Sequence, residues 1–401
     1  MLPAVQAVVL WPPLTADEQR ADRCRDQWVR DMGGRDKGTN NIADAEEPDI
    51  DGLQSPYDPE DTDEDDLWFL PAMPEDRAPT DMPLPAAVRT KRFTSDDWLL
   101  AETEVGRLFA EAAAQLARYD ERLRRLPGCH ERIALLSASA ALEVQGDWLP
   151  AERIALYVAL RERGGDEALE LRQADWAVRR YLSGLDPRDD LSGYLGRHPT
   201  DRDGFLDLDL FGEPARGEEF SNLSREWLSF LDAMEANYAP PLIRAGAAFH
   251  HWRTSAISAP GIITEPAVIA SVLAADELQA GFVPVTLGGR LDLLAQGGTE
   301  ARLRGWLRAV RDGCARALLE LERVETWRNR ATDATRDLSG KTPPRIIDTL
   351  VRSTLTSTDM LSSATKSSKA AIRRNMAEFE NRGLVREVTG QGRYRFWGIK
   401  A

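Results

Sequence analysis

The 401-residue chain has little cysteine and histidine, and it lacks the short motifs that mark most catalytic and metal sites. Its three cysteines, Cys24, Cys129 and Cys314, lie far apart and form no CxxC pair. This argues against a disulfide framework or a structural zinc site, and it suits a reducing compartment. His250 and His251 are adjacent rather than four residues apart, so they cannot chelate a metal from one helix face. We therefore expect no metal and no cofactor.

Other missing motifs narrow the functional class of the protein further. The sequence has no Walker loop, no G-x-S-x-G and no zincin motif, which removes the commonest nucleotide-binding and hydrolase signatures. The opening MLPAVQAVVLWPP has no basic segment and is too short to span a bilayer. We expect a short strand or docking segment there, and a cytoplasmic protein associated with the nucleoid rather than with a membrane.

Charge is distributed unevenly along the chain. The whole sequence carries 51 Lys/Arg and 66 Asp/Glu, a net charge of −15. From residue 341 to the end, 12 Lys/Arg face 5 Asp/Glu, a local charge of +7, which leaves −22 for the first 340 residues. Binding of a polyanion is therefore expected at the C-terminal end and not through the bulk charge of the body.

Residues 41–80 form an acidic stretch with 14 Asp/Glu, one Arg and six prolines. Such a composition buries too little apolar surface to offset the entropy of ordering. We expect an N-terminal segment over residues 1–93 that is partly disordered, with parts such as Leu67 to Leu70 docking on the body. The alternative is a functional acidic segment that competes with DNA for the basic tail or binds a protein partner.

Residues 94–335 predict an all-α body, because apolar side chains recur there at three- and four-residue steps. Thr94 to Asp97 resembles a capping box, and the helix that it opens is expected to continue to Pro127. The glycine- and proline-rich residues 183–220 are expected to form a long connection, and residues 282–286 are the strand candidate. Other helices are expected near 131–145, 151–163, 167–182, 223–234, 241–252, 265–278 and 300–332, with Trp252, Trp306 and Trp327 in the core.

Residues 341–401 predict a winged helix-turn-helix domain, because a suitable residue stands at each break. Pro343 and Pro344 can open the first helix. Ser357 or Thr358 can cap a second helix over 359–364, which would bury Met360 and Leu361, and Ser368 can cap the third. The mainly α fold class therefore includes a small α+β domain at the C-terminal end.

The third helix, residues 369–382, is expected to bury Ile372, Met376 and Phe379 and to end at Gly383 in the left-handed conformation. A strand from Leu384, a turn over 389–392 and a return strand over 393–397 would form the wing. Alternation along the return strand places Tyr394 and Phe396 on one face. It places Arg393, Arg395 and Trp397 on the other face.

In such a domain the start of the third helix enters the major groove and the wing contacts the flanking backbone or the minor groove. The candidate DNA-binding residues are Lys366, Ser367, Ser368, Lys369, Arg373, Arg374, Arg393 and Arg395. We expect a sequence-specific, double-stranded DNA-binding protein, most simply a transcriptional regulator. Because such proteins commonly contact paired half-sites, a homodimer formed through the body is one expected arrangement. A winged helix used only for protein contacts, on a non-catalytic adapter, is the alternative.

Several stretches resemble the Fic family, in particular uncharacterised, often plasmid-borne proteins of plant-associated bacteria with a C-terminal helix-turn-helix. They are residues 134–143, residues 240–249, Arg304-Gly-Trp306 with its helix, and the tail GLVREVTGQGRYRFW. The resemblance covers roughly residues 94–401. It implies a Fic-like helical body over 94–335, followed by the winged domain over 341–401.

The resemblance also implies that the catalytic machinery is degenerate. A working Fic enzyme transfers AMP through a His in an HPFxxGNGR-type loop, whereas this chain has Phe249-His-His-Trp-Arg253 and no glycine-rich cradle. Ser139 and Glu143 partly match the family's inhibitory S/T-x-x-x-E-G/N motif, but Val144 stands where Gly or Asn belongs. We expect no enzyme activity, a buried or interface histidine pair, and in Glu143 a structural acid or a relic. A residual nucleotidyl transferase that uses His250 or His251 is the alternative.

Overall fold

The computed structural model describes residues 93–126, 128–160, 167–197, 214–276, 278–390 and 395–400. All of them belong to one compact unit, Leu84–Ala401. The predictions for the opening apolar segment and for the acidic stretch 41–80 lie outside the described residues.

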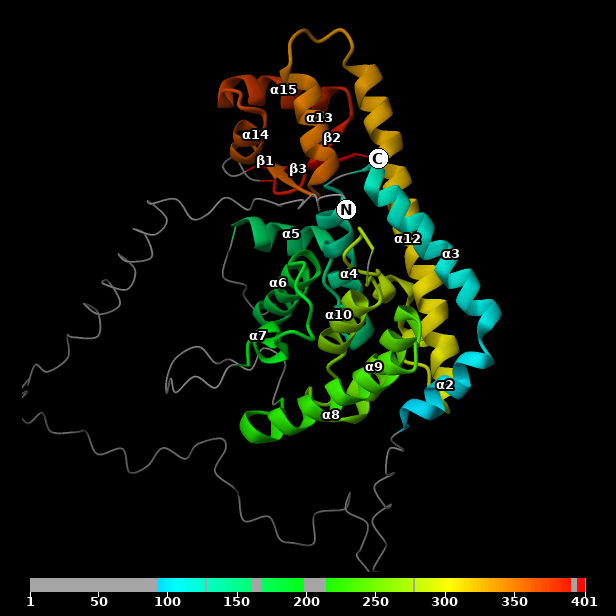
Figure 1. Ribbon diagram of the computed structural model, residues 1–401. Helices are drawn as coiled ribbons and strands as arrows, with labels where there is room; N and C mark the ends of the chain where they lie inside the picture. The colour runs from blue at the N-terminus through cyan, green and yellow to red at the C-terminus, as the bar shows by residue number, and fades with distance from the viewer. Residues whose placement is uncertain are drawn as a thin grey trace, which may run out of the picture. The chain divides into compact units, whose positions relative to one another are not determined.

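Helices make up the body, as predicted (Figure 1). The long helix α12 runs alongside α3 and continues past it to the C-terminal domain. The elements of the body are α2 (Ser95–Thr103), α3 (Gly106–Arg125), α4 (His130–Gln145), α5 (Ala151–Leu160), α6 (Ala168–Leu182), α7 (Leu191–Leu195), α8 (Gly217–Ala236), α9 (Pro241–Thr254), α10 (Thr264–Leu273), the 3₁₀ turn η2 (Val285–Gly288), α11 (Arg290–Leu293) and α12 (Thr299–Ala334).

The first predicted helix is present but broken in two. Thr94 caps α2, and its hydroxyl and the Asp97 carboxylate form the expected reciprocal capping box. The prediction of one helix as far as Pro127 was wrong, because the chain breaks between α2 and α3. There the Thr103 hydroxyl donates to the Leu100 carbonyl at 2.7 Å, and the backbone of Val105 is not helical, with φ −112° and ψ 8°.

Two further predictions for the body were wrong. Residues 282–286 form no strand: Pro284 has no N–H to donate to a ladder, and the chain turns into η2 against α4 and α12. The connection over 183–220 is shorter than predicted, because it contains α7 and because α8 begins at Gly217 rather than near residue 223. Packing against distant helices shapes residues 282–286, whereas α7 is capped locally by the Asp190 carboxylate, which accepts from the Gly193 N–H.

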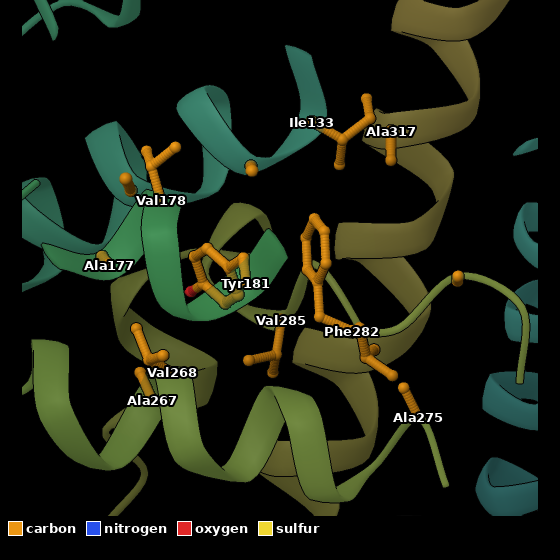
Figure 2. Close-up of a cluster of buried hydrophobic side chains, with 14 of the residues drawn as sticks. Ile133, Ala177, Val178, Tyr181, Ala267, Val268, Ala275, Phe282, Val285 and Ala317 are labelled. Atoms are coloured by element: carbon orange, nitrogen blue, oxygen red, sulfur yellow. The ribbon is translucent and has the colours of Figure 1, made fainter. Parts of the chain in front are cut away.

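The core of the body is centred on Phe282 (Figure 2). The Phe282 ring lies 4.5 Å from that of Tyr181, with Ile133 of α4 and Val268 of α10 nearby. At Gly288 the chain passes so close to α12 that an added Cβ would lie 2.2 Å from the Ala309 carbonyl oxygen. Only glycine fits there, and η2 is thereby held against α12. The three tryptophans predicted as core, Trp252, Trp306 and Trp327, are all buried.

The C-terminal domain has the predicted order of helices and strands. Its elements are α13 (Thr342–Arg352), β1 (Thr356–Ser357), α14 (Thr358–Thr365), α15 (Lys369–Asn381), β2 (Val385–Glu387) and β3 (Phe396–Ile399). The strands form one antiparallel sheet in the order β1-β3-β2, with Thr356 opposite Trp397 and Val385 opposite Ile399. The mainly α class with a small α+β domain is therefore confirmed.

Two side chains of this domain do not lie where the pattern placed them. Met360 was predicted to be buried but is 37% exposed, because Leu361 alone faces the core from the first turn of α14. Trp397 was predicted on the face opposite Phe396, together with Arg395, but both Trp397 and Phe396 are buried. Strand β3 lies between β1 and β2, and every residue of it is buried, so alternation does not separate a core face from a solvent face.

Candidate nucleic-acid interface

The turn between α14 and α15 is built by local chemistry that the sequence predicts. The Ser357 hydroxyl accepts a hydrogen bond from the Met360 N–H at 3.2 Å and so caps α14. The Ser368 hydroxyl accepts one from the Ala371 N–H at 3.3 Å and caps α15. Between the two helices Lys366 takes the left-handed conformation, with φ 53°. The Ser368 cap fixes where α15 begins.

Helix α15 has one apolar face and one basic face. Ile372, Met376 and Phe379 are buried, as the spacing i, i+4, i+7 predicts. Arg373 and Arg374, which follow Ile372 directly, are exposed. An apolar stripe fixed in the domain core thus holds two guanidinium groups outward on the N-terminal half of the helix.

The remaining predicted residues near the turn differ in their surroundings. Lys369 is exposed, and its ammonium group lies 2.7 Å from the Asp359 carboxylate in the first turn of α14. Lys366 and Ser368 are also exposed. Ser367 is half-buried: its hydroxyl lies 3.2 Å from that of Thr342, so it takes part in the structure of the turn. Its contribution to DNA binding remains a prediction.

The wing is described only in part. Arg393 lies outside the described residues. Arg395 is exposed, just before β3, and its Nε lies 3.1 Å from the Glu387 carboxylate on β2. The Glu387 side chain is only 13% exposed, so this cross-strand partner orients the half-exposed arginine from a largely buried carboxylate.

One functional arginine was missing from the predicted set. Arg382, directly after α15, donates two hydrogen bonds to the Asp337 carboxylate, at 2.6 and 2.8 Å, and others to Glu378 and to the Ala334 carbonyl. The Arg382 guanidinium lowers the pKa of Asp337 to about 2. Arg382 therefore clamps the end of α15 to the end of α12. A net charge counted from the sequence does not distinguish such a structural arginine from one that contacts DNA.

A second clamp comes from α12. The Trp327 indole N–H donates to the Leu384 carbonyl at 2.7 Å, and Trp327 is buried. Leu384 directly precedes β2. The C-terminal end of the helix is thus anchored by both a charged and a buried contact, while its N-terminal end is exposed.

The two histidines in the Fic-like stretch are buried in α9. The ring of His250 stacks on that of Trp98 with centroids 5.7 Å apart, and the ring of His251 stacks on that of Phe230 at 4.2 Å. Burial lowers the pKa of His250 well below its usual range, and the nearby charges of Arg253 and Arg302 lower it further. The expected buried histidine pair is confirmed.

Glu143, by contrast, is exposed, and Ser139 donates its hydroxyl proton to the Leu149 carbonyl at 2.6 Å. Within the described residues, no group of three or more His, Cys, Asp or Glu side chains could hold a metal ion. In the same part of the chain no helix is long and apolar enough to cross a membrane.

Comparison with known proteins gives three results. The model is similar to the crystal structure of a Fic family protein from Desulfovibrio desulfuricans G20, with 15% sequence identity and a TM-score of 0.41, over 74% of this chain and 95% of that one. No curated protein matches the sequence. Residues 343–400 match a family model described as "HTH DNA binding domain". The chain therefore carries a helix-turn-helix DNA-binding domain at its C-terminal end.

Proposed function

We propose that the protein binds double-stranded DNA sequence-specifically and regulates transcription. One observation supports this above all: the N-terminal half of α15 holds Arg373 and Arg374 outward from a buried apolar stripe. In helix-turn-helix proteins this part of the third helix enters the major groove. Arginine there can donate two hydrogen bonds to a guanine edge, or it can pair with a phosphate.

The contacts divide into two kinds. We assign Arg373, Arg374 and Ser368 to base edges, and Lys366, Lys369 and Arg395 to phosphates. Phosphate contacts set affinity without sequence preference, whereas base contacts discriminate among sequences. Each phosphate contact releases counterions, so the affinity falls steeply with salt, by about 0.9 in log K per log unit of salt for each contact.

The test is fluorescence anisotropy of the full chain with duplexes from neighbouring promoters and with random duplexes, each at two salt concentrations. We expect promoter DNA to stay bound at the higher salt while random DNA dissociates. Equal loss of both duplexes would contradict sequence specificity. If the full chain binds no duplex at low salt, the domain is a protein-contact module and the proposal fails.

We infer further that the helical body is not a nucleotidyl transferase. A general base must reach the proton that it removes, and His250 is buried against Trp98. Labelled ATP incubated with the protein, a cell lysate and Mg²⁺ or Mn²⁺ should transfer no label. Label that disappears in the His250→Ala variant would contradict this inference.

A further inference from the structure

The helix-turn-helix domain is attached to the body by more than the chain that links α12 to α13. The start of α4, some 220 residues earlier in the sequence, contacts the end of α13. Three residues make the contact: Gly128, Cys129 and Arg132. We call this contact the α4 seat.

Arg132 is the main residue of the seat. Its Nη2 donates to the Leu350 carbonyl at 3.1 Å and to the Ser353 carbonyl at 2.8 Å. Its Nη1 lies 3.6 Å from the Glu320 carboxylate on α12. Arg132 is 3% exposed, and burying a guanidinium is costly unless its protons are paired. Nη1 and Nη2 have these partners, whereas the buried Nε has no hydrogen-bond partner among the described residues. Here one side chain joins α4, α12 and α13.

The chemistry of the seat suits the end of a helix. The last carbonyls of an α-helix have no partner within the helix, and they carry a partial negative charge. At the end of α13, Leu350 O accepts from Arg132, and Val351 O accepts from the buried Cys129 thiol at 3.6 Å. The start of α4, with its partial positive charge, faces them.

Backbone shape completes the seat. Gly128 has φ +98°, and a Cβ added there would lie 2.5 Å from the Arg352 Cγ. The chain of the body therefore approaches α13 as closely as glycine permits. Such close packing over buried charged and polar contacts differs from a domain tethered by a flexible linker.

We propose that Arg132 is a positioning residue for DNA binding: the α4 seat holds the helix-turn-helix domain in one orientation, so that domain and body meet the duplex as one rigid unit. The orientation does not depend on any ligand, whereas its consequence for affinity rests on the proposed function. A preorganised domain loses less entropy on binding, and the acidic body is then held at a fixed position relative to the DNA.

The test compares Arg132→Met with Arg244→Met in the full chain. Arg244 is a matched control, because it is also a buried arginine, 2.8 Å from Asp276, but it pairs within the body. Spin labels at Ser221→Cys on α8 and Glu380→Cys on α15, both exposed sites, report the distance between body and domain. Cys24 is replaced by Ser in every variant, and the buried Cys129 and Cys314 are retained.

We expect one narrow distance distribution for the parent and for Arg244→Met, and a broad one for Arg132→Met, with partial recovery in Arg132→Lys. On unlabelled protein, Arg132→Met should weaken duplex binding by about three- to tenfold, and Arg244→Met should leave it unchanged. If Arg132→Met does not fold, Gly128→Ala opens the same contact through Arg352 without removing a buried charge.

The outcomes separate the two claims. An unchanged distribution for both Arg132→Met and Gly128→Ala would overturn the proposal. A broad distribution with unchanged affinity would overturn the link to DNA binding. If the parent binds no duplex, the proposed function fails, while the distance distributions still decide whether the seat orients the domain.

Discussion

The two ends of α15 differ in what holds them. At the start, Arg373 and Arg374 are exposed, and Lys369 has an exposed ion pair with Asp359. At the end, Arg382 is clamped to α12, and Trp327 of α12 donates to the Leu384 carbonyl. The comparison shows that basic charge in this domain has two uses. Arg373 and Arg374, which face water, are available to DNA, whereas Arg382, which is engaged with Asp337, holds the domain to the end of α12.

The largest effect on DNA affinity should come from substitutions at the exposed N-terminal end of α15. Replacing Arg373 and Arg374 together by Ala removes two cations from the groove-facing side, and each is worth about 1–3 kcal/mol of binding. We expect promoter affinity in anisotropy to fall at least about tenfold while the urea midpoint stays constant. The control is the double variant Arg107→Ala/Arg179→Ala, which removes the same charge from exposed sites on the body. Equal losses in the two double variants would mean that only net charge matters.

Substitutions at the clamped C-terminal end of α15 should lower the stability of the fold rather than the affinity for DNA. Trp327→Phe keeps a ring in the core but removes the indole donor to the Leu384 carbonyl, which retains the Lys400 N–H as a donor at 2.9 Å. The loss of this one hydrogen bond should cost about 0.5–1.5 kcal/mol. We expect a lower urea midpoint and faster amide exchange over 384–388. Trp252→Phe, which removes an indole donor to Ser258 within the body, should lower the midpoint without that local change. Faster exchange over 384–388 in both variants would show that Trp327 does not act locally.

Acid should destabilise the helical body but not the helix-turn-helix domain, because residues 341–401 contain no histidine. The folded-state pKa of His250 lies well below the unfolded value of 6.5. Below pH 6.5 the unfolded chain therefore binds a proton that the folded chain does not. Stability is complete above pH 6.5 and falls as the pH drops toward the folded pKa, by at most about 1.4 kcal/mol per pH unit.

The His250→Phe variant should reduce this loss in urea titrations between pH 7.5 and 5.5. Part of the loss should remain, because burial also lowers the pKa of His130. Duplex affinity of the folded protein should change little over the same range, since the C-terminal domain has no histidine. An acid loss of equal size in the variant would assign it to other groups.

The smallest effect on stability should come from Asp337→Asn. This substitution removes the exposed carboxylate that accepts hydrogen bonds from Arg382. Exposed ion pairs contribute little, and Arg382 keeps Glu378 and the Ala334 carbonyl. Amide exchange over 378–384 should rise by less than about tenfold. Asp333→Asn, which removes the exposed partner of Arg336 on the same helix end, should leave that segment unchanged. A large loss of promoter affinity in Asp337→Asn would mean that the clamp controls the DNA-binding face.

Much of the C-terminal domain could be predicted because its breaks depend on neighbouring residues. Ser357 and Ser368 cap helices as expected, and Gly383 takes the left-handed conformation with φ 65°. The capping box at Thr94 was predictable for the same reason. Caps and turns are chemistry over three or four residues, so one sequence contains all the information that they need.

The rest could not be predicted because it depends on residues far apart in the chain. Trp397 is buried because β3 lies between two strands, and residues 282–286 turn because α12 passes beside them. The roles of Arg132 and Arg382 depend on partners about 220 and 45 residues away. In the sequence both are ordinary helical arginines.

The most direct test of the account is hydrogen exchange of the full chain with and without a promoter duplex. The first N–H groups of α15 have no partner within the helix, so contact with DNA should slow exchange over 366–374. Exchange over 376–384, already anchored to α12, should not change. Slowing that is confined to α12 or α13, or absent throughout while the duplex is bound, would contradict the assignment of the start of α15 as the DNA-binding surface.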